Sequence, residues 1–68
     1  MSPNSVPSKT QKGTDEIATR QNKLDARLRA VLIMVNGKTT VAELGQKFGA
    51  DVTPLLQQLA AKGFVREG

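Results

Sequence analysis

Side chains that commonly carry out chemistry are scarce in this chain. The 68 residues include no His and no Cys, so the commonest metal ligand, the usual neutral-pH base and every thiolate are missing. Asp25, Glu43 and Asp51 stand where helices are expected to start. Asp15 and Glu16 lie in a polar segment with no apolar pocket to tune a catalytic carboxylate. We therefore expect no enzyme activity, no metal site and no cofactor.

One segment, NGKTT at residues 36–40, superficially resembles the end of a phosphate-binding loop. That motif needs a glycine five residues before Gly37, where this chain has Leu32. It also needs a preceding strand, and the residues before Asn36 have helical periodicity instead. The sequence therefore argues against nucleotide binding at this segment.

The residues best suited to recognition lie on the outward face of a predicted helix after Asp51. With Val52 at the centre of the buried face, a step of 100° per residue identifies the side chains that point outward. A glutamine can pair bidentately with adenine, and a threonine can contact a phosphate or a thymine methyl. A neutral solvated face would have the same composition, and the sequence leaves both interpretations open. The outward positions are Pro54, Gln57, Gln58 and Ala61, with Thr53 and Lys62 at the edges.

The charge balance favours an anionic partner only mildly. The whole chain carries a net charge of +4, with a pI near 10.0, but part of this charge lies in the N-terminal segment. Lysines and an arginine around the predicted helix after Asp51 would contact backbone phosphates of DNA. The alternative explanation of these residues is that they are ordinary, scattered surface charges. The predicted nucleic-acid-binding residues are Thr53, Gln57, Gln58, Lys62, Lys38, Lys47 and Arg66.

Three predicted helices between residues 25 and 63 position these side chains. Apolar residues recur at helical spacing in each, and Thr40 with Glu43 forms the pattern of a capping box. The expected start residues are Asp25, Thr40 and Asp51, and the expected ends are Asn36-Gly37, Gly49 and Gly63. The residues expected to face the core are Leu24, Leu28, Val31, Leu32, Val35, Val41, Leu44, Phe48, Val52, Leu55, Leu56 and Leu59.

The chain divides into three predicted segments. Residues 1–13 have the composition of a disordered basic tail, residues 14–24 form a short helical or docking segment capped by Thr14, and residues 25–68 form the folded domain. Residues 64–66 are a strand candidate whose partner would be residues 38–40. The basic residues before Leu24 form a solubilising tail or an arm that reaches across DNA; they are Lys9, Lys12, Arg20 and Lys23.

The turn at residues 48–51 has a spacing that matches a known family. Gly45 precedes Gly49 by four residues, and Leu55 and Leu59 follow it by six and ten. Together with the run TVAEL at 40–44 and the passage LAAKGFV at 59–65, this resembles the helix-turn-helix of the winged-helix superfamily. The resemblance implies a third helix that enters the DNA major groove, although many tri-helical domains bind protein instead. Since the sequence ends at Gly68, we expect a truncated or absent wing.

A second surface is predicted on the first of the three helices. Ile33 falls about 180° from the apolar stripe, beside Ala26 and Ala30. We expect Ile33 to be covered by Ile17 of the preceding segment, by a second copy of the chain or by a partner protein.

These observations predict an all-α or nearly all-α fold: a tri-helical helix-turn-helix bundle with at most a minimal two-stranded sheet. The predicted function is weak DNA binding or accessory transcriptional regulation. The alternative is a protein-interaction or dimerisation module that does not bind DNA. No apolar run is long enough to span a membrane, and residues 1–13 lack the apolar core of a signal peptide, so we expect a cytoplasmic location.

Overall fold

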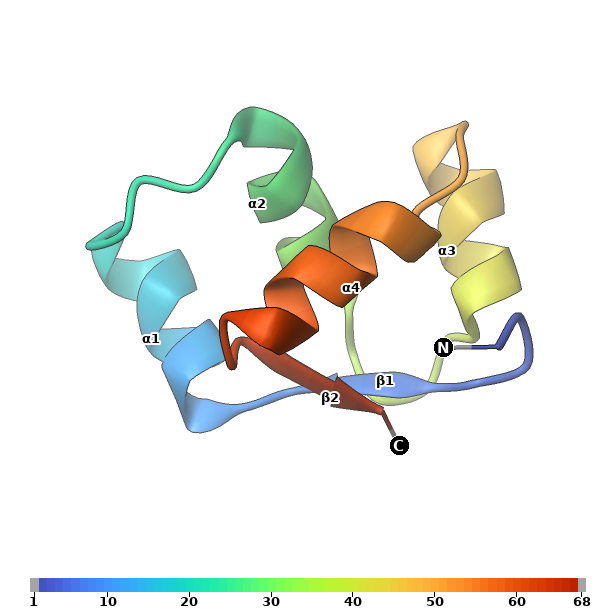
Figure 1. The fold of residues 1–68 in the computed structure, drawn as a ribbon, viewed down its shortest axis with the longest axis horizontal. Helices are drawn as coiled ribbons and strands as arrows, with labels where there is room; N and C mark the ends of the chain where they lie inside the picture. Colours follow the sequence, from blue (N-terminus) through green and yellow to red (C-terminus); the bar gives the residue numbers. More distant parts are fainter. Residues whose placement is uncertain (1, 68) are drawn as a thin grey trace.

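Four helices and two short strands make up the fold in the computed structural model, which describes residues 2–67. The elements are β1 (Pro7–Lys9), α1 (Gln11–Thr19), α2 (Ala26–Met34), α3 (Val41–Phe48), α4 (Thr53–Ala61) and β2 (Val65–Glu67). Figure 1 shows α4 lying in front of the other helices, with the strands crossing below it. The prediction of a mostly helical fold with a minimal sheet is confirmed, and the fold contains one helix more than the predicted bundle.

The sheet joins the two ends of the chain. β1 pairs antiparallel with β2, with Ser8 opposite Arg66 at the centre of the register. The prediction that residues 38–40 would supply the partner strand is wrong. The side-chain Oδ1 of Asn36 accepts hydrogen bonds from the backbone N–H groups of Lys38 and Thr39, at 2.9 and 3.0 Å. These donors are bound in a local turn, so the segment is not available as a strand.

The N-terminal segment contacts the rest of the fold, which differs from the predicted disordered tail. Pro7 is buried, and the backbone of β1 is paired with β2. Helix α1 is capped by Thr10, whose Oγ1 accepts a hydrogen bond from the N–H of Gly13 at 3.1 Å, and not by Thr14. Pairing and burial compensate the ordering entropy that the polar composition alone would leave unopposed.

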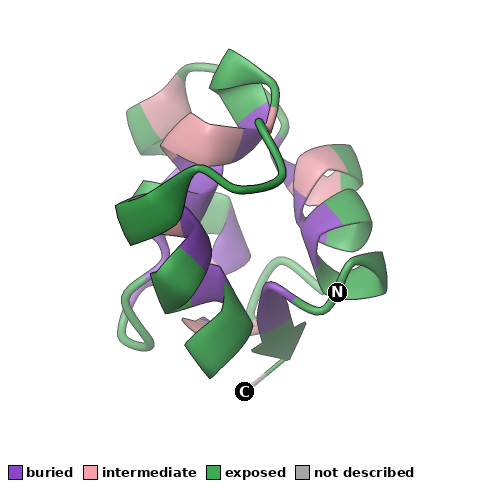
Figure 2. Ribbon diagram, turned by 90° about the vertical axis from the view of Figure 1, so that its left-hand side faces the viewer, coloured by how far each residue is buried: buried purple, intermediate pink, exposed green. Residues whose placement is uncertain are grey.

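The core lies where α2, α3 and α4 face one another. Figure 2 shows the buried residues of these helices turned toward the centre of the molecule. The inward faces predicted from the periodicity are confirmed, with Leu24, Phe48 and Leu55 only partly buried at the edge. The buried apolar core consists of Leu28, Val31, Leu32, Val35, Val41, Leu44, Val52, Leu56, Leu59, Phe64 and Val65.

Helix α3 carries the predicted capping box. The Oγ1 of Thr40 accepts a hydrogen bond from the N–H of Glu43 at 3.2 Å, and the Glu43 carboxylate accepts from the N–H of Thr40 at 3.2 Å. The helix ends at Gly49, whose φ of 86° confirms the predicted left-handed turn. The hydrogen bonds from Thr40 to the Glu43 carboxylate hold its pKa below the ordinary value for glutamate.

We expect Thr40→Ala to destabilise the protein by about 1 kcal/mol, because the variant loses an N-cap. It should also raise the pKa of Glu43, which loses the hydroxyl donor. A depressed carboxyl pKa stabilises the fold above the ordinary glutamate pKa, and this contribution disappears as the pH falls through the folded-state value. Urea unfolding and an NMR titration of Glu43 measure the two effects; unchanged values of both would contradict the capping box.

Candidate nucleic-acid interface

Helix α4 has one buried face and one exposed face. Leu56 and Leu59 are fully buried in the core, whereas Gln57 and Gln58 are exposed. The structure therefore places the two glutamines on the surface, as the helical periodicity predicts. Of the other residues assigned to this face, Pro54, Ala61 and Lys62 are exposed and Thr53 is partly buried.

Both ends of α4 are fixed by hydrogen bonds. At the start, the N-cap is Val52 and not the predicted Asp51, but the Asp51 carboxylate accepts a hydrogen bond from the N–H of Thr53 at 3.0 Å, which lowers the pKa of Asp51. At the end, the N–H of Phe64 donates to the carbonyl of Leu59 at 2.9 Å, and Gly63 adopts a φ of 83°. The exposed face of α4 is thus presented by a helix with two fixed ends and a buried opposite side.

A cation from the N-terminal segment joins the C-terminal end of α4. The Nζ of Lys12 donates a hydrogen bond to the carbonyl of Lys62 at 2.8 Å, and it lies 5.1 Å from the centroid of the Phe64 ring. The prediction from the sequence placed Lys12 in a solubilising tail or an arm and did not include this contact. No local signal could have revealed it, because Lys12 and Lys62 are 50 residues apart.

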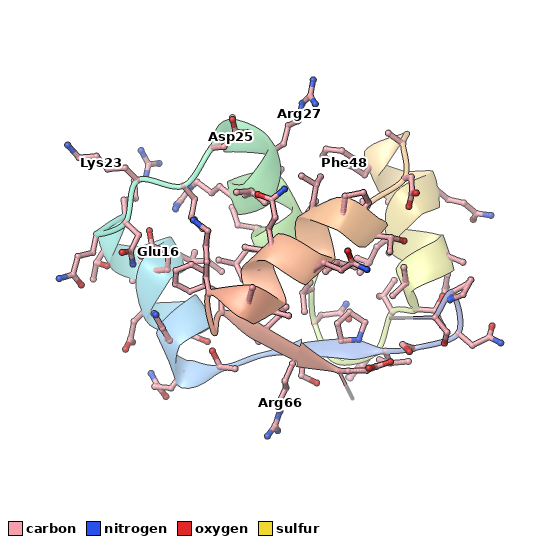
Figure 3. All side chains as sticks on the ribbon, viewed as in Figure 1. Glu16, Lys23, Asp25, Arg27, Phe48 and Arg66 are labelled. Carbon is pink, nitrogen blue, oxygen red and sulfur yellow. The ribbon has the colours of Figure 1, made fainter. Side chains whose placement is uncertain are left out.

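The other predicted phosphate-contacting residues are dispersed over the fold. Lys38 is exposed in the connection between α2 and α3, and Lys47 is exposed in the last turn of α3. Arg66 extends from β2 away from α4, as Figure 3 shows. Of the four basic residues in the predicted nucleic-acid-binding set, only Lys62 therefore lies at the end of α4, where Lys12 joins it.

Each of the six acidic side chains accepts a hydrogen bond from a neutral donor of the chain. Asp25 caps α2 through the N–H of Arg27 at 2.8 Å, as predicted. The six donor residues are Gln11 for Asp15, Asn22 for Glu16, Arg27 for Asp25, Thr40 for Glu43, Thr53 for Asp51 and Ser5 for Glu67.

A shallow hollow of about 390 Å³ borders the start of α4. It is lined by residues of α3, by the start of α4 and by Pro3 of the N-terminal segment; the carbonyls of Pro3 and Ser5 accept hydrogen bonds from the N–H groups of Ala42 and Val41. The carboxylate of Asp51 at its edge disfavours a phosphate there. The lining residues are Pro3, Val41, Ala42, Gly45, Gln46, Ala50, Asp51 and Thr53.

The second predicted surface, on α2, is exposed. Ile33 has an exposed fraction of 48 %, while Ala26 is exposed and Ala30 partly buried. Ile17 packs against the core and Ile33 remains half exposed, so Ile17 does not cover Ile33 completely. Helix α1 approaches the rest of the fold at Gly13, where an added Cβ would meet the backbone of Phe64.

The described residues contain neither a helix long and apolar enough to cross a membrane nor a cluster of three potential metal ligands. Searches of protein-family models, curated proteins and solved structures find no match to this chain. The structure accordingly supports a small, mostly helical domain with a two-stranded sheet, without a family assignment.

Proposed function

We propose that this chain is a non-enzymatic helix-turn-helix module that binds double-stranded DNA weakly through α4, in an accessory role in transcriptional regulation. The observation that supports it most is the adjacent pair Gln57 and Gln58, exposed on a helix whose opposite face and both ends are fixed. Because the helix backbone is already fixed, the conformational entropy lost on contacting base edges is mainly the rotamer freedom of the two glutamine side chains.

The proposed contacts divide into base reading and phosphate binding. Gln57 or Gln58 pairs with the N6 and N7 edge of adenine in the major groove, and Thr53 contacts a phosphate or a thymine methyl. Lys62 and Lys12 supply positive charge at the C-terminal end of α4. Because the exposed face of α4 itself carries no charge, the complex is weak and depends on a few phosphate contacts.

A second candidate function is a protein-interaction or dimerisation module. It is favoured by Ile33, the only large apolar side chain that is exposed among the described residues. A partner protein or a second copy of the chain would bury it together with Ala26 and Ala30. Sedimentation of the chain alone distinguishes self-association from a monomer.

The DNA-binding proposal is tested by titrating a pool of short duplexes at several salt concentrations. We expect affinity to fall with salt at a logarithmic slope of about −0.9 per phosphate contact. The Gln57→Ala/Gln58→Ala variant should lose its preference among duplexes while its melting temperature stays the same, because both side chains are exposed.

The matched control is Gln21→Ala/Gln46→Ala, which removes two exposed glutamines that lie outside α4. This variant should keep the sequence preference. Equal loss of preference in both variants would show that α4 does not read the bases. Absence of any binding at low salt would exclude DNA as the partner.

A further inference from the structure

A pocket of about 350 Å³ lies between the end of α1 and the start of α2. Three of the five residues that line it are cationic, and none is acidic. The remaining two, Leu24 and Ala26, give it an apolar wall. The five lining residues, here called the basic pocket, are Arg20, Lys23, Leu24, Ala26 and Arg29.

The backbone at this pocket is unusual at two of its cations. Arg20 has a φ of 55° and Lys23 a φ of 49°, and they are the only non-glycine residues of the described chain in the left-handed region. A glycine would adopt this conformation at lower cost, since a Cβ makes it unfavourable by about 1 kcal/mol or more. Both positions instead carry long basic side chains that line the same pocket. At Arg20 this conformation is that of the C-cap that ends α1, whereas at Lys23 it lies in the loop that follows.

A buried carboxylate fixes the loop that carries these residues. Glu16 has an exposed fraction of 2 %, and its oxygens accept hydrogen bonds from the N–H of Asn22 at 3.0 and 3.1 Å and from its Nδ2 at 2.8 Å. Neither Glu16 nor Asp25 lines the pocket. Figure 3 shows Lys23 extending outward from this loop, above Glu16. The loop is thus held from inside, and its basic side chains are left on the outer side.

The third cation is held from α1. The Nη2 of Arg29 donates a hydrogen bond to the carbonyl of Ile17 at 3.0 Å, and the side chain is partly buried. A guanidinium has five N–H donors in a planar fork, so several remain for an oxyanion. Cations near the C-terminus of a helix also stabilise its dipole. The dipole of α1 accounts for one cation near its C-terminus, but it does not require three cations around one pocket.

We propose that the basic pocket binds a phosphate group, which Arg29 contacts at its base and Arg20 and Lys23 enclose from the rim. The group belongs either to a small phosphorylated molecule or to a nucleic-acid backbone. The pocket is lined by residues 20–29 alone and includes no residue of α4, so the inference stands independently of the proposed function.

The test uses the full ¹⁵N-labelled chain titrated with sodium pyrophosphate at constant ionic strength. We expect saturable shifts of the amide resonances between Arg20 and Arg29. The Arg20→Gln/Lys23→Gln variant should bind about ten-fold more weakly, because two charge-assisted contacts are lost. The control, Lys38→Gln/Lys47→Gln, removes the same charge elsewhere and should change affinity by less than about two-fold.

Shifts that do not saturate, that map outside residues 20–29, or that weaken equally in the control variant would overturn the proposal. The location and saturation of the wild-type shifts test the pocket even if the pocket variant is unstable. A second titration with a short DNA duplex identifies the source of the phosphate. A backbone phosphate is indicated if the pocket variant weakens duplex binding and lowers its salt slope; a small phosphorylated molecule is indicated if duplex binding is unchanged while pyrophosphate binding is lost.

Discussion

Gly13→Ala is expected to destabilise the protein by about 3 kcal/mol, a large part of the stability of so small a domain. A Cβ at Gly13 would lie 2.1 Å from the carbonyl oxygen of Phe64 and 3.0 Å from its carbon. Backbone atoms cannot rotate away, so α1 must separate from the turn between α4 and β2. That movement breaks the hydrogen bond from the N–H of Thr10 to the same Phe64 carbonyl, at 3.0 Å.

Helix propensity acts in the opposite direction, which makes the experiment informative. Alanine is favoured over glycine inside a helix by about 1 kcal/mol, so an undocked α1 would be stabilised by this change. Thr14→Ala, at the next and exposed position, is the control and should change the unfolding free energy by about 0.5 kcal/mol. Urea unfolding measures both variants. A Gly13→Ala protein as stable as the wild type would show that α1 does not dock here and would favour the disordered tail expected from composition.

Both ends of α3 could be predicted because their signals are local, whereas α2 ends at Met34, before the predicted Asn36-Gly37, and the N-cap of α4 is Val52 and not the predicted Asp51. Thr40 and Glu43 are three residues apart and satisfy each other's backbone donors, and Gly49 adopts the left-handed conformation that ends α3. Each signal depends on neighbours in the sequence. The core faces of α2, α3 and α4 were predictable for the same reason, since burial follows the helical period.

The contacts of the N-terminal segment could not be predicted, because they join residues far apart. Thr14 matched the local pattern of an N-cap, followed by acidic residues. The structure uses Thr10 instead, whose hydroxyl also donates to the carbonyl of Gly63 at 2.6 Å. Glu16, predicted to lie in the first turn, is buried and holds the loop after α1. Contacts between residues far apart in the sequence determine both the N-cap of α1 and the burial of Glu16, and the amino-acid composition does not indicate such contacts.

The candidate surfaces also combine features that local periodicity predicts with features that depend on distant contacts. The exposure of Gln57 and Gln58 follows from the periodicity of α4, whereas the approach of Lys12 to Lys62 depends on where α1 docks. Ile33 shows the limit most clearly. Counting along the helix placed it opposite the core stripe, but the helical period could not tell whether another part of the chain would cover it, and the structure leaves it half exposed.

Phe64→Ala is expected to have the second large effect, a loss of about 3–5 kcal/mol in unfolding free energy. Phe64 has an exposed fraction of 1 % and joins α1, α4 and β2 in the core. Its ring also lies under the Lys12 ammonium. Removing it leaves a cavity at the point where α4 passes into β2, so both elements lose their common anchor.

The chain provides its own matched control in Phe48, its only other aromatic residue, which is partly buried at the end of α3. The same substitution there removes the same atoms but leaves less of a cavity, so Phe48→Ala should cost about half as much. Urea unfolding of the two variants measures the ratio. Equal losses at the two positions would show that Phe64 is not the anchor of the α1, α4 and β2 junction. A larger loss at Phe64, together with lost protection of the β2 amides in hydrogen exchange, would show that the side chain holds the sheet to the end of α4.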